Sequence, residues 1–131
     1  MLRGLANLNV VADDMTHALD WYTGVFGEPP YFVRPEQGEP QYAEWRFGDD
    51  EDEFALMSSA FRPSLAEPGG ALAYFHVDDI RAAAEWMAGL GARAVDPVME
   101  RGGGFWTASF ADPFGNLIGL MQSPHWRDAH T

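Results

Sequence analysis

The stretch that decides the fold of this chain is Phe110-Ala111-Asp112-Pro113-Phe114-Gly115-Asn116-Leu117-Ile118-Gly119-Leu120-Met121. Its centre, Asp-Pro followed by Gly-Asn, is typical of a tight turn. Proline presets φ, glycine accepts a positive φ, and the aspartate and asparagine side chains bond to their own backbone. Because the residues on both sides of the turn have strand character, the stretch predicts a β-hairpin.

The composition is that of one globular domain spanning residues 1–131. Of the 131 residues, 47% are hydrophobic and 21% are charged, which is enough apolar material for a core. No apolar run has the length of a membrane span and no signal peptide is expected, so we predict a cytoplasmic location. The absence of cysteine excludes disulfides and thiolate chemistry, and the absence of lysine excludes a Schiff base.

The net charge of −12 excludes several kinds of partner. Nucleic acids and anionic membranes would be repelled, and the eight arginines are scattered rather than clustered. The densest acidic run, Asp49-Asp50-Glu51-Asp52-Glu53, lacks the alternating ligands and the glycine of an EF-hand loop. We interpret this run as a solvated turn rather than a cation site.

The first half of the chain, residues 5–58, has the pattern β-α-β-β-β. The alternation of polar and apolar residues predicts a strand over Leu5–Val11. Asp13 and Asp14 are then expected to cap a helix that ends before Gly27. The expected helix is Met15–Phe26 and the later strands are Tyr31–Arg34, Tyr42–Phe47 and Phe54–Ser58.

The second half, residues 70–122, repeats this pattern after a linker rich in proline and glycine at residues 59–69. The expected elements are a strand over Ala71–Val77, a helix over Ile80–Leu90 capped by Asp78 and Asp79, and strands over Ala94–Met99, Phe105–Phe110 and Leu117–Gln122. We interpret residues 123–131 as a polar tail. The Gly102-Gly103-Gly104 turn lacks the sequence of a phosphate-binding loop, so we expect a flexible hairpin.

The two halves match residue by residue at a spacing of about 65 positions. Asp13-Asp14-Met15 corresponds to Asp78-Asp79-Ile80, and Ala55-Leu56-Met57 corresponds to Gly119-Leu120-Met121. With the aromatic residue before Asp-Pro, the Gly-Asn turn and the Trp21–Gly27 helix ending, the chain resembles the vicinal oxygen chelate superfamily of glyoxalases, bleomycin resistance proteins and dioxygenases. The resemblance implies an α+β fold of two tandem βαβββ modules, which form a U-shaped trough, and a homodimer.

Strand alternation predicts which side chains line that trough. An almost wholly apolar set faces the helices, whereas the opposite set mixes aromatic, methionine and polar residues, as small-molecule pockets do. From the second set we expect ligand binding by Asn9, Tyr42, Arg46, Met57, Tyr74, Phe105, Thr107 and Met121.

The resemblance also implies where a metal would bind. The superfamily's metal positions correspond to Asn7, Ala55, Leu72 and Gly119. Alanine, leucine and glycine side chains cannot ligate a cation and one asparagine is too weak. We therefore expect no metal cofactor. A divalent metal at a non-standard site built from His76, Glu44 and Glu100 stays open as an alternative.

His76 and Glu44 are the candidate catalytic residues, because histidine titrates near neutrality and could act as a general base. The alternative is that His76 binds a ligand or a neighbouring carboxylate. His17, His125 and His130 are expected to be solvated.

Two functions remain open on these grounds. The first is a metal-independent binding protein, similar to bleomycin resistance proteins, that takes an aromatic or cationic small molecule. The second is a glyoxalase-like or dioxygenase-like enzyme, catalysing a lyase, isomerase or ring-cleavage reaction, with a non-standard metal site or with His76 as base.

Overall fold

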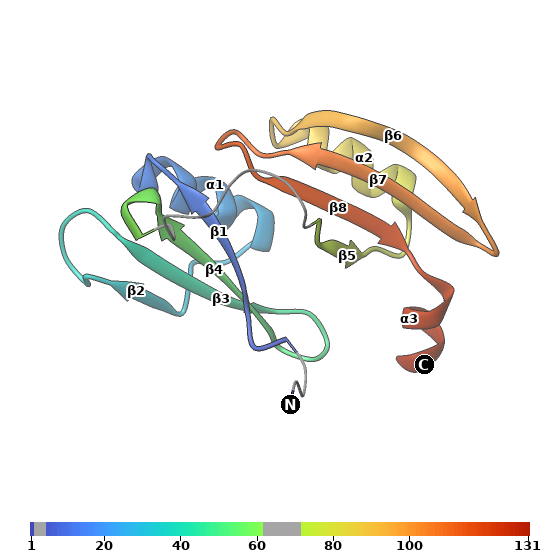
Figure 1. Cartoon of the computed structure of the whole chain (residues 1–131), viewed down its shortest axis with the longest axis horizontal. Helices are drawn as coiled ribbons and strands as arrows, with labels where there is room; N and C mark the ends of the chain where they lie inside the picture. Colours follow the sequence, from blue (N-terminus) through green and yellow to red (C-terminus); the bar gives the residue numbers. More distant parts are fainter. Residues whose placement is uncertain (2–4, 62–71) are drawn as a thin grey trace. The chain divides into compact units, whose positions relative to one another are not determined.

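The computed structural model describes Met1, residues 5–61 and residues 72–131 (Figure 1). The chain divides into two compact units, Met1–Glu67 and Pro68–Thr131, called here the first and second units. The boundary falls within the predicted linker, of which residues 62–69 lie outside the described residues.

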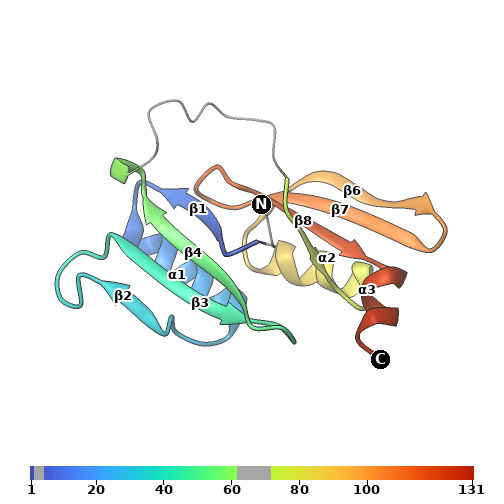
Figure 2. The same ribbon diagram turned by 60° about the horizontal axis from the view of Figure 1, so that its bottom comes forward.

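The first unit is a four-stranded sheet in the order β1-β4-β3-β2 with one helix, α1, on one face (Figure 2). Strand β1 runs parallel to β4, and the other neighbouring pairs are antiparallel. Its elements are β1 Leu8–Ala12, α1 Met15–Phe26, β2 Phe32–Arg34, β3 Tyr42–Phe47, β4 Asp52–Ser58 and the 3-10 helix η1 Ser59–Phe61.

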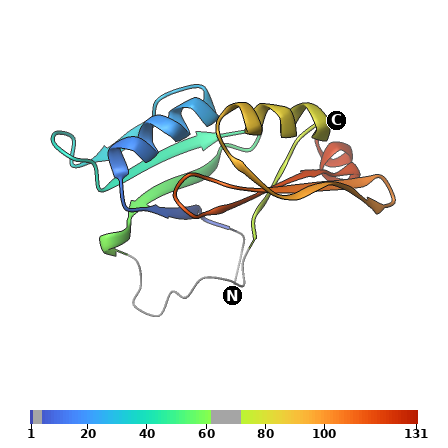
Figure 3. The ribbon, with the colours of Figure 1, turned by 90° about the horizontal axis from the view of Figure 1, so that it is seen from above.

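The second unit repeats this topology. Its sheet has the order β5-β8-β7-β6, β5 runs parallel to β8, and α2 lies along one face of the sheet (Figure 3). Its elements are β5 Tyr74–His76, α2 Ile80–Gly89, β6 Arg93–Gly102, β7 Phe105–Ala111, β8 Leu117–Gln122 and α3 Pro124–Ala129. The predicted α+β fold with two tandem βαβββ modules is confirmed.

The helices begin at the aspartates that the sequence predicts. Asp14 caps α1 by accepting a hydrogen bond from the backbone N–H of His17 at 3.1 Å, and Gly27 ends the helix at φ 74°. Asp79 caps α2 by accepting from the N–H groups of Arg81 and Ala82, both at 3.1 Å. Each cap satisfies donors that the first turn of a helix leaves unpaired.

Four strands differ from the sequence-based boundaries by two residues or more, and the other predicted elements differ by one residue at most. Strand β1 starts at Leu8 instead of Leu5, and β4 starts at Asp52, inside the acidic run. Strand β5 covers only three residues, and the predicted start at Ala71 lies outside the described residues. Strand β6 extends to Gly102 because it continues to pair with β7 beyond Met99, Glu100 with Trp106 and Gly102 with Phe105.

The segment that we interpreted as a polar tail contains helix α3. Ser123 caps it by accepting from the N–H of Trp126 at 3.2 Å, and Pro124 occupies its first turn, where a missing N–H costs nothing. Among the described residues, no helix combines the length and apolarity needed to cross a membrane.

An aromatic cluster forms the core of the first unit between α1 and the sheet. Tyr22 and Phe26 of α1 pack on Trp45 and Phe54, with ring centroids 4.9–6.3 Å apart. Trp45 is 1% exposed, and its indole Nε1 donates to the carbonyl of Glu28 at 3.0 Å. This packing fixes which face of the sheet is turned away from α1.

Trp45→Ala should lower the free energy of unfolding by about 3–5 kcal/mol, because it leaves a cavity in this cluster. Denaturant unfolding followed by circular dichroism measures the change. The matched control is Trp86→Ala on α2, where the indole is 46% exposed and the expected loss is below about 0.5 kcal/mol. Equal losses for the two variants would contradict the packing described here.

The β7–β8 hairpin depends on one buried carboxylate, Asp112. Its Oδ1 accepts from the backbone N–H groups of Phe114 at 2.9 Å and Asn116 at 2.7 Å, and its Oδ2 accepts from the Asn116 side chain at 2.8 Å. Gly115 supplies the positive φ of 94° that the turn requires. The predicted hairpin is thus confirmed at the level of its hydrogen bonds.

Asp112→Ala should cost about 1–3 kcal/mol of unfolding free energy, because it removes the acceptor for backbone donors in a half-buried turn. Asp112→Asn keeps one side-chain oxygen and should lose less. Thermal unfolding of both variants checks the order. An alanine variant as stable as the wild type would show that water replaces the carboxylate without cost.

Candidate functional site

Three side chains of β3 lie on the face of the first sheet opposite α1. Tyr42, Glu44 and Arg46 alternate with Ala43 and Trp45, and the latter two are buried against the helix. The sheet register places Met57 of β4 directly opposite Tyr42. The structure therefore brings together four residues that the sequence predicts for the site: Tyr42, Glu44, Arg46 and Met57.

A cavity of about 300 Å³ opens beside Tyr42 and Met57. No polar atom contributes to its surface. The guanidinium of Arg34 lies 4.2 Å from the centre of the Phe32 ring, and its Nη1 donates to the carbonyl of Val33 at 2.9 Å and lies 3.4 Å from Oε1 of Glu36. The residues lining the cavity are Arg34, Pro35, Gln41, Tyr42, Met57 and Phe61.

Two backbone hydrogen bonds hold together the segments that line this cavity. The N–H of Gln41 donates to the carbonyl of Arg34 at 2.8 Å, and the N–H of Ser58 donates to the carbonyl of Gln41 at 2.9 Å. These bonds join the β2–β3 loop to the end of β4. They leave the cavity walls to side-chain carbon, so the cavity suits an apolar or aromatic group.

Four residues of the cavity were missed by the sequence analysis: Arg34, Pro35, Gln41 and Phe61. They belong to the end of β2, the loop after it and η1, none of which follows the strand alternation used to predict the site. The pairing of β2 with β3 could have indicated these residues, because it places Arg34 opposite Tyr42 and brings the loop between the two strands beside Tyr42.

Glu44 lies next to the cavity and is hydrogen-bonded to Tyr42, which lines it. The hydroxyl of Tyr42 donates to Oε1 of Glu44 at 2.5 Å. Burial, and then the negative charge of Glu53, raise the pKa of Glu44, while Arg46 and a hydrogen bond from Asn7 act in the opposite direction. Burial and Glu53 also raise the pKa of Tyr42.

Arg46 is directed to other partners. Its guanidinium lies 3.4 Å from Oε1 of Glu53 and 4.5 Å from the centre of the Tyr31 ring. Both contacts are largely exposed, so they contribute little to stability. The guanidinium of Arg46 consequently neutralises the negative charge of Glu44 only in part.

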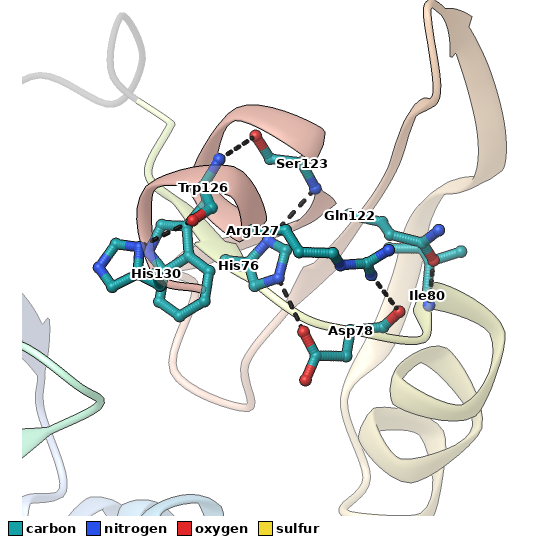
Figure 4. Close-up of polar contacts among 8 residues, drawn as sticks. All are labelled: His76, Asp78, Ile80, Gln122, Ser123, Trp126, Arg127 and His130. Atoms are coloured by element: carbon teal, nitrogen blue, oxygen red, sulfur yellow. Dashed lines mark hydrogen bonds and ion pairs between the residues drawn. The ribbon is translucent and has the colours of Figure 1, made fainter.

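His76 of the second unit has partners at both ring nitrogens (Figure 4). Its Nδ1 accepts from the backbone N–H of Ser123 at 3.2 Å, so Nε2 carries the proton and donates to Asp78 at 3.0 Å. Its ring stacks on Trp126 at 4.3 Å. His76 therefore binds a neighbouring carboxylate, which is one of the two alternatives that the sequence left open. To abstract a proton at Nδ1, the ring would first have to lose its hydrogen bond from Ser123.

His130 differs from the solvated state that we expected. Its ring stacks on the other face of Trp126 at 3.8 Å, and its Nδ1 lies 2.7 Å from the carbonyl of that residue. His125 is exposed and lies edge-on to Phe105. The His76–Trp126–His130 stack attaches α3 to β5, which explains why a short C-terminal helix forms there (Figure 4).

The remaining predicted ligand-binding residues occupy varied environments. Asn9 is exposed and donates to the side chain of Asn7 at 2.8 Å. Tyr74 is exposed, and Met121 is half-buried beside His76 in the register of β5 and β8. Thr107 is buried, and its hydroxyl accepts from Nε of Arg101 at 3.0 Å.

The four positions that correspond to the superfamily's metal ligands do not fit a metal. Ala55 and Gly119 are buried, and Leu72 carries no donor atom. A Cβ atom at residue 119 would lie 2.6 Å from the Tyr74 ring and 2.8 Å from the carbonyl oxygen of Ala73, so a longer side chain has no room there. Over residues 5–61 and 72–131, no three His, Asp or Glu side chains gather as a metal site would require.

The fold defines a class of protein, one built from two tandem βαβββ modules. The sequence matches the family model of the Glyoxalase/Bleomycin resistance protein/Dioxygenase superfamily over residues 4–120. The chain belongs to this superfamily.

Solved structures of the same fold are similar over nearly the whole chain. A glyoxalase/bleomycin resistance protein from Catenulispora acidiphila is 24% identical with a TM-score of 0.63, covering 92% of this chain and 100% of that one. TioX from Micromonospora sp. ML1 is 18% identical with a TM-score of 0.67, covering 90% and 98%. The fosfomycin resistance protein FosX from Listeria monocytogenes is 16% identical with a TM-score of 0.71, covering 94% and 95%. No curated protein matches the sequence.

Glu44→Gln should stabilise the protein at neutral pH and lose this advantage in acid. A carboxyl whose pKa is raised in the folded state costs stability as pH rises from its unfolded pKa through its folded pKa. Glutamine removes that cost and keeps an oxygen that can accept from Tyr42. Unfolding measured between pH 4 and pH 8 should show the difference growing with pH.

Glu39→Gln, at an exposed position in the β2–β3 loop, is the matched control for removing one negative charge. An advantage of Glu44→Gln that is larger in acid than at neutral pH would contradict the direction of the shift.

Proposed function

We propose that this protein is a metal-independent small-molecule-binding protein, similar to bleomycin resistance proteins, that takes an aromatic or cationic ligand. The observation that carries the proposal is the cavity of about 300 Å³, whose surface holds no polar atom. A volume at the lower end of the range for ligand sites suits one or two fused rings.

The side chains around the cavity support an aromatic ligand. Tyr42 presents a ring, Met57 a polarizable thioether and Phe61, which is 61% exposed, a second aromatic wall. An anionic group is disfavoured, because the guanidinium of Arg34 already contacts the Phe32 ring and the carboxylate of Glu36.

Charge supports a ligand that is neutral or cationic. The chain carries a net charge of −12, which attracts cations and raises their local concentration. Glu44 places one partly compensated carboxylate beside Tyr42, at the border of the cavity. A ligand whose ring occupies the cavity and carries an amine could place that amine near the Glu44 carboxylate, beside the Tyr42 hydroxyl.

The same residues argue for binding over catalysis. The positions that correspond to metal ligands carry Asn7, Ala55, Leu72 and Gly119, and both nitrogens of His76 are engaged by the protein itself. The similar fold of the fosfomycin resistance protein FosX is a precedent for antibiotic resistance on this scaffold. Capture of a toxic molecule would need only affinity, which the cavity can provide without a reaction.

The neutral apolar fluorophore N-phenyl-1-naphthylamine is expected to bind this cavity and brighten on binding. Met57→Gln and Phe61→Ala should each weaken its affinity about tenfold, which corresponds to about 1.4 kcal/mol. The matched control is Met99→Gln on β6, where the side chain is 37% exposed and the affinity should not change. Fluorescence titration measures all four proteins.

Metal independence is tested in the same titration with EDTA added, together with elemental analysis of the purified protein. Unchanged affinity in EDTA and no stoichiometric metal are expected. Loss of binding in EDTA, or a bound metal that disappears in His76→Ala, would contradict the proposal and favour an enzyme with a relocated metal site.

A further inference from the structure

The C-terminal helix α3 is attached to the second unit mainly through one imidazole ring, that of His76 (Figure 4). The helix has six residues and none of them is buried. A helix of this length is not stable by itself in water, so α3 depends on its contacts with the rest of the unit. The His76 side chain is only 8% exposed, which shows that α3 covers it closely.

Two hydrogen bonds beside His76 join the same parts of the chain. Nη2 of Arg127 on α3 donates to the carbonyl of Asp78 at 3.0 Å. Oε1 of Gln122, at the end of β8, accepts from the N–H of Ile80 at 3.0 Å and satisfies a donor in the first turn of α2. The residues around α3 thus hold the loop between β5 and α2, and His76 lies at the start of that loop.

The hydrogen bond between Ser123 and His76 requires a neutral ring. The backbone N–H of Ser123 donates to Nδ1 of His76 at 3.2 Å, and Nε2 donates to Asp78. A protonated imidazole carries a hydrogen on both nitrogens and accepts at neither. Protonation of His76 would therefore place two donors opposite each other at a position with little access to water, where an unpaired donor is costly.

Charged and titratable groups around His76 act in both directions. The carboxylate of Asp78 and the face of Trp126 favour a positive ring, although Asp78 is 85% exposed and its charge is screened. Arg127, and His130 when it is protonated, oppose a second positive charge. Met121, the partner of His76 on β8, carries no charge. None of these groups restores an acceptor at Nδ1.

We propose that α3 is a pH-dependent cover of His76, docked while the ring is neutral and released when the ring is protonated. The docked form binds one proton fewer than the released form, so docking weakens as the pH falls through the range in which histidines titrate, about pH 8 to 5. Acid would then expose His76 and the indole of Trp126. This regulation lies within the second unit and does not depend on the cavity proposed as the ligand site of the first.

Trypsin cleavage after Arg127 measures the release of α3 in the full chain, because the docked helix holds this side chain against Asp78. The cleavage rate reports the open population when opening and closing are fast. Each rate is divided by that of a synthetic peptide of residues 119–131 at the same pH. We expect the ratio to rise about tenfold between pH 8 and about pH 5.5, which corresponds to about 1.4 kcal/mol.

Two variants identify the histidine that responds to pH. His76→Asn offers an oxygen acceptor to Ser123 and cannot be protonated, so its ratio should stay constant with pH. His130→Gln is the matched control, because it removes the other ring stacked on Trp126 and should keep the tenfold rise. Each variant loosens α3 by removing a stacked ring, so the pH dependence is compared and not the absolute rate.

Four results would overturn the proposal: a constant ratio in the wild type, a tenfold rise that persists in His76→Asn, a rise that disappears in His130→Gln, and an equal rise in cleavage after Arg93 of β6, which would show unfolding of the whole unit. If His76→Asn does not fold, nitrogen NMR of the His76 ring in the wild type decides. The ring and the cleavage ratio should change over the same pH range, and separate midpoints would exclude His76 as the cause.

Discussion

In each unit the first and last strands lie side by side and run parallel, β1 with β4 and β5 with β8. A parallel pair cannot be closed by a tight turn, so the chain must cross over between the two strands, and a helix makes part of that crossover. The helix covers one face of the sheet and buries the aromatic cluster around Trp45. The opposite face is left for Tyr42, Glu44 and Tyr74, and the candidate sites lie there as a result.

The elements that the sequence predicts well are those set by local chemistry. The caps at Asp14 and Asp79 and the turn around Asp112 depend on residues two to four positions away, and all three form as expected. The length of β6 and the existence of α3 depend on distant partners. Continued pairing with β7 extends β6 beyond Met99, and stacking of Trp126 on His76 holds α3, so neither is visible in a local pattern.

The candidate site shows the same division. Alternation along β3 and β4 predicts that Tyr42, Glu44 and Met57 share a face, because strand geometry fixes the direction of every second side chain. The other walls of the cavity, such as Pro35 and Phe61, come from a loop and a 3-10 helix, where no period applies. Sequence reasoning therefore finds the side of the sheet but not the shape of the cavity.

The absence of a side chain at residue 119 can be understood in two ways. Compared with the superfamily, it is a position without a metal ligand; within this structure, it is the position that makes room for an aromatic ring. A carboxylate at residue 119 would require the Tyr74 ring to leave and the carbonyl of Ala73 to shift, so one substitution could not restore a ligand there. The Tyr74 ring and the backbone of β5 occupy the space that a metal-ligating side chain on β8 would need at this position. That coupling explains why glycine occupies this position, because any side chain at residue 119 would meet both the Tyr74 ring and the carbonyl oxygen of Ala73.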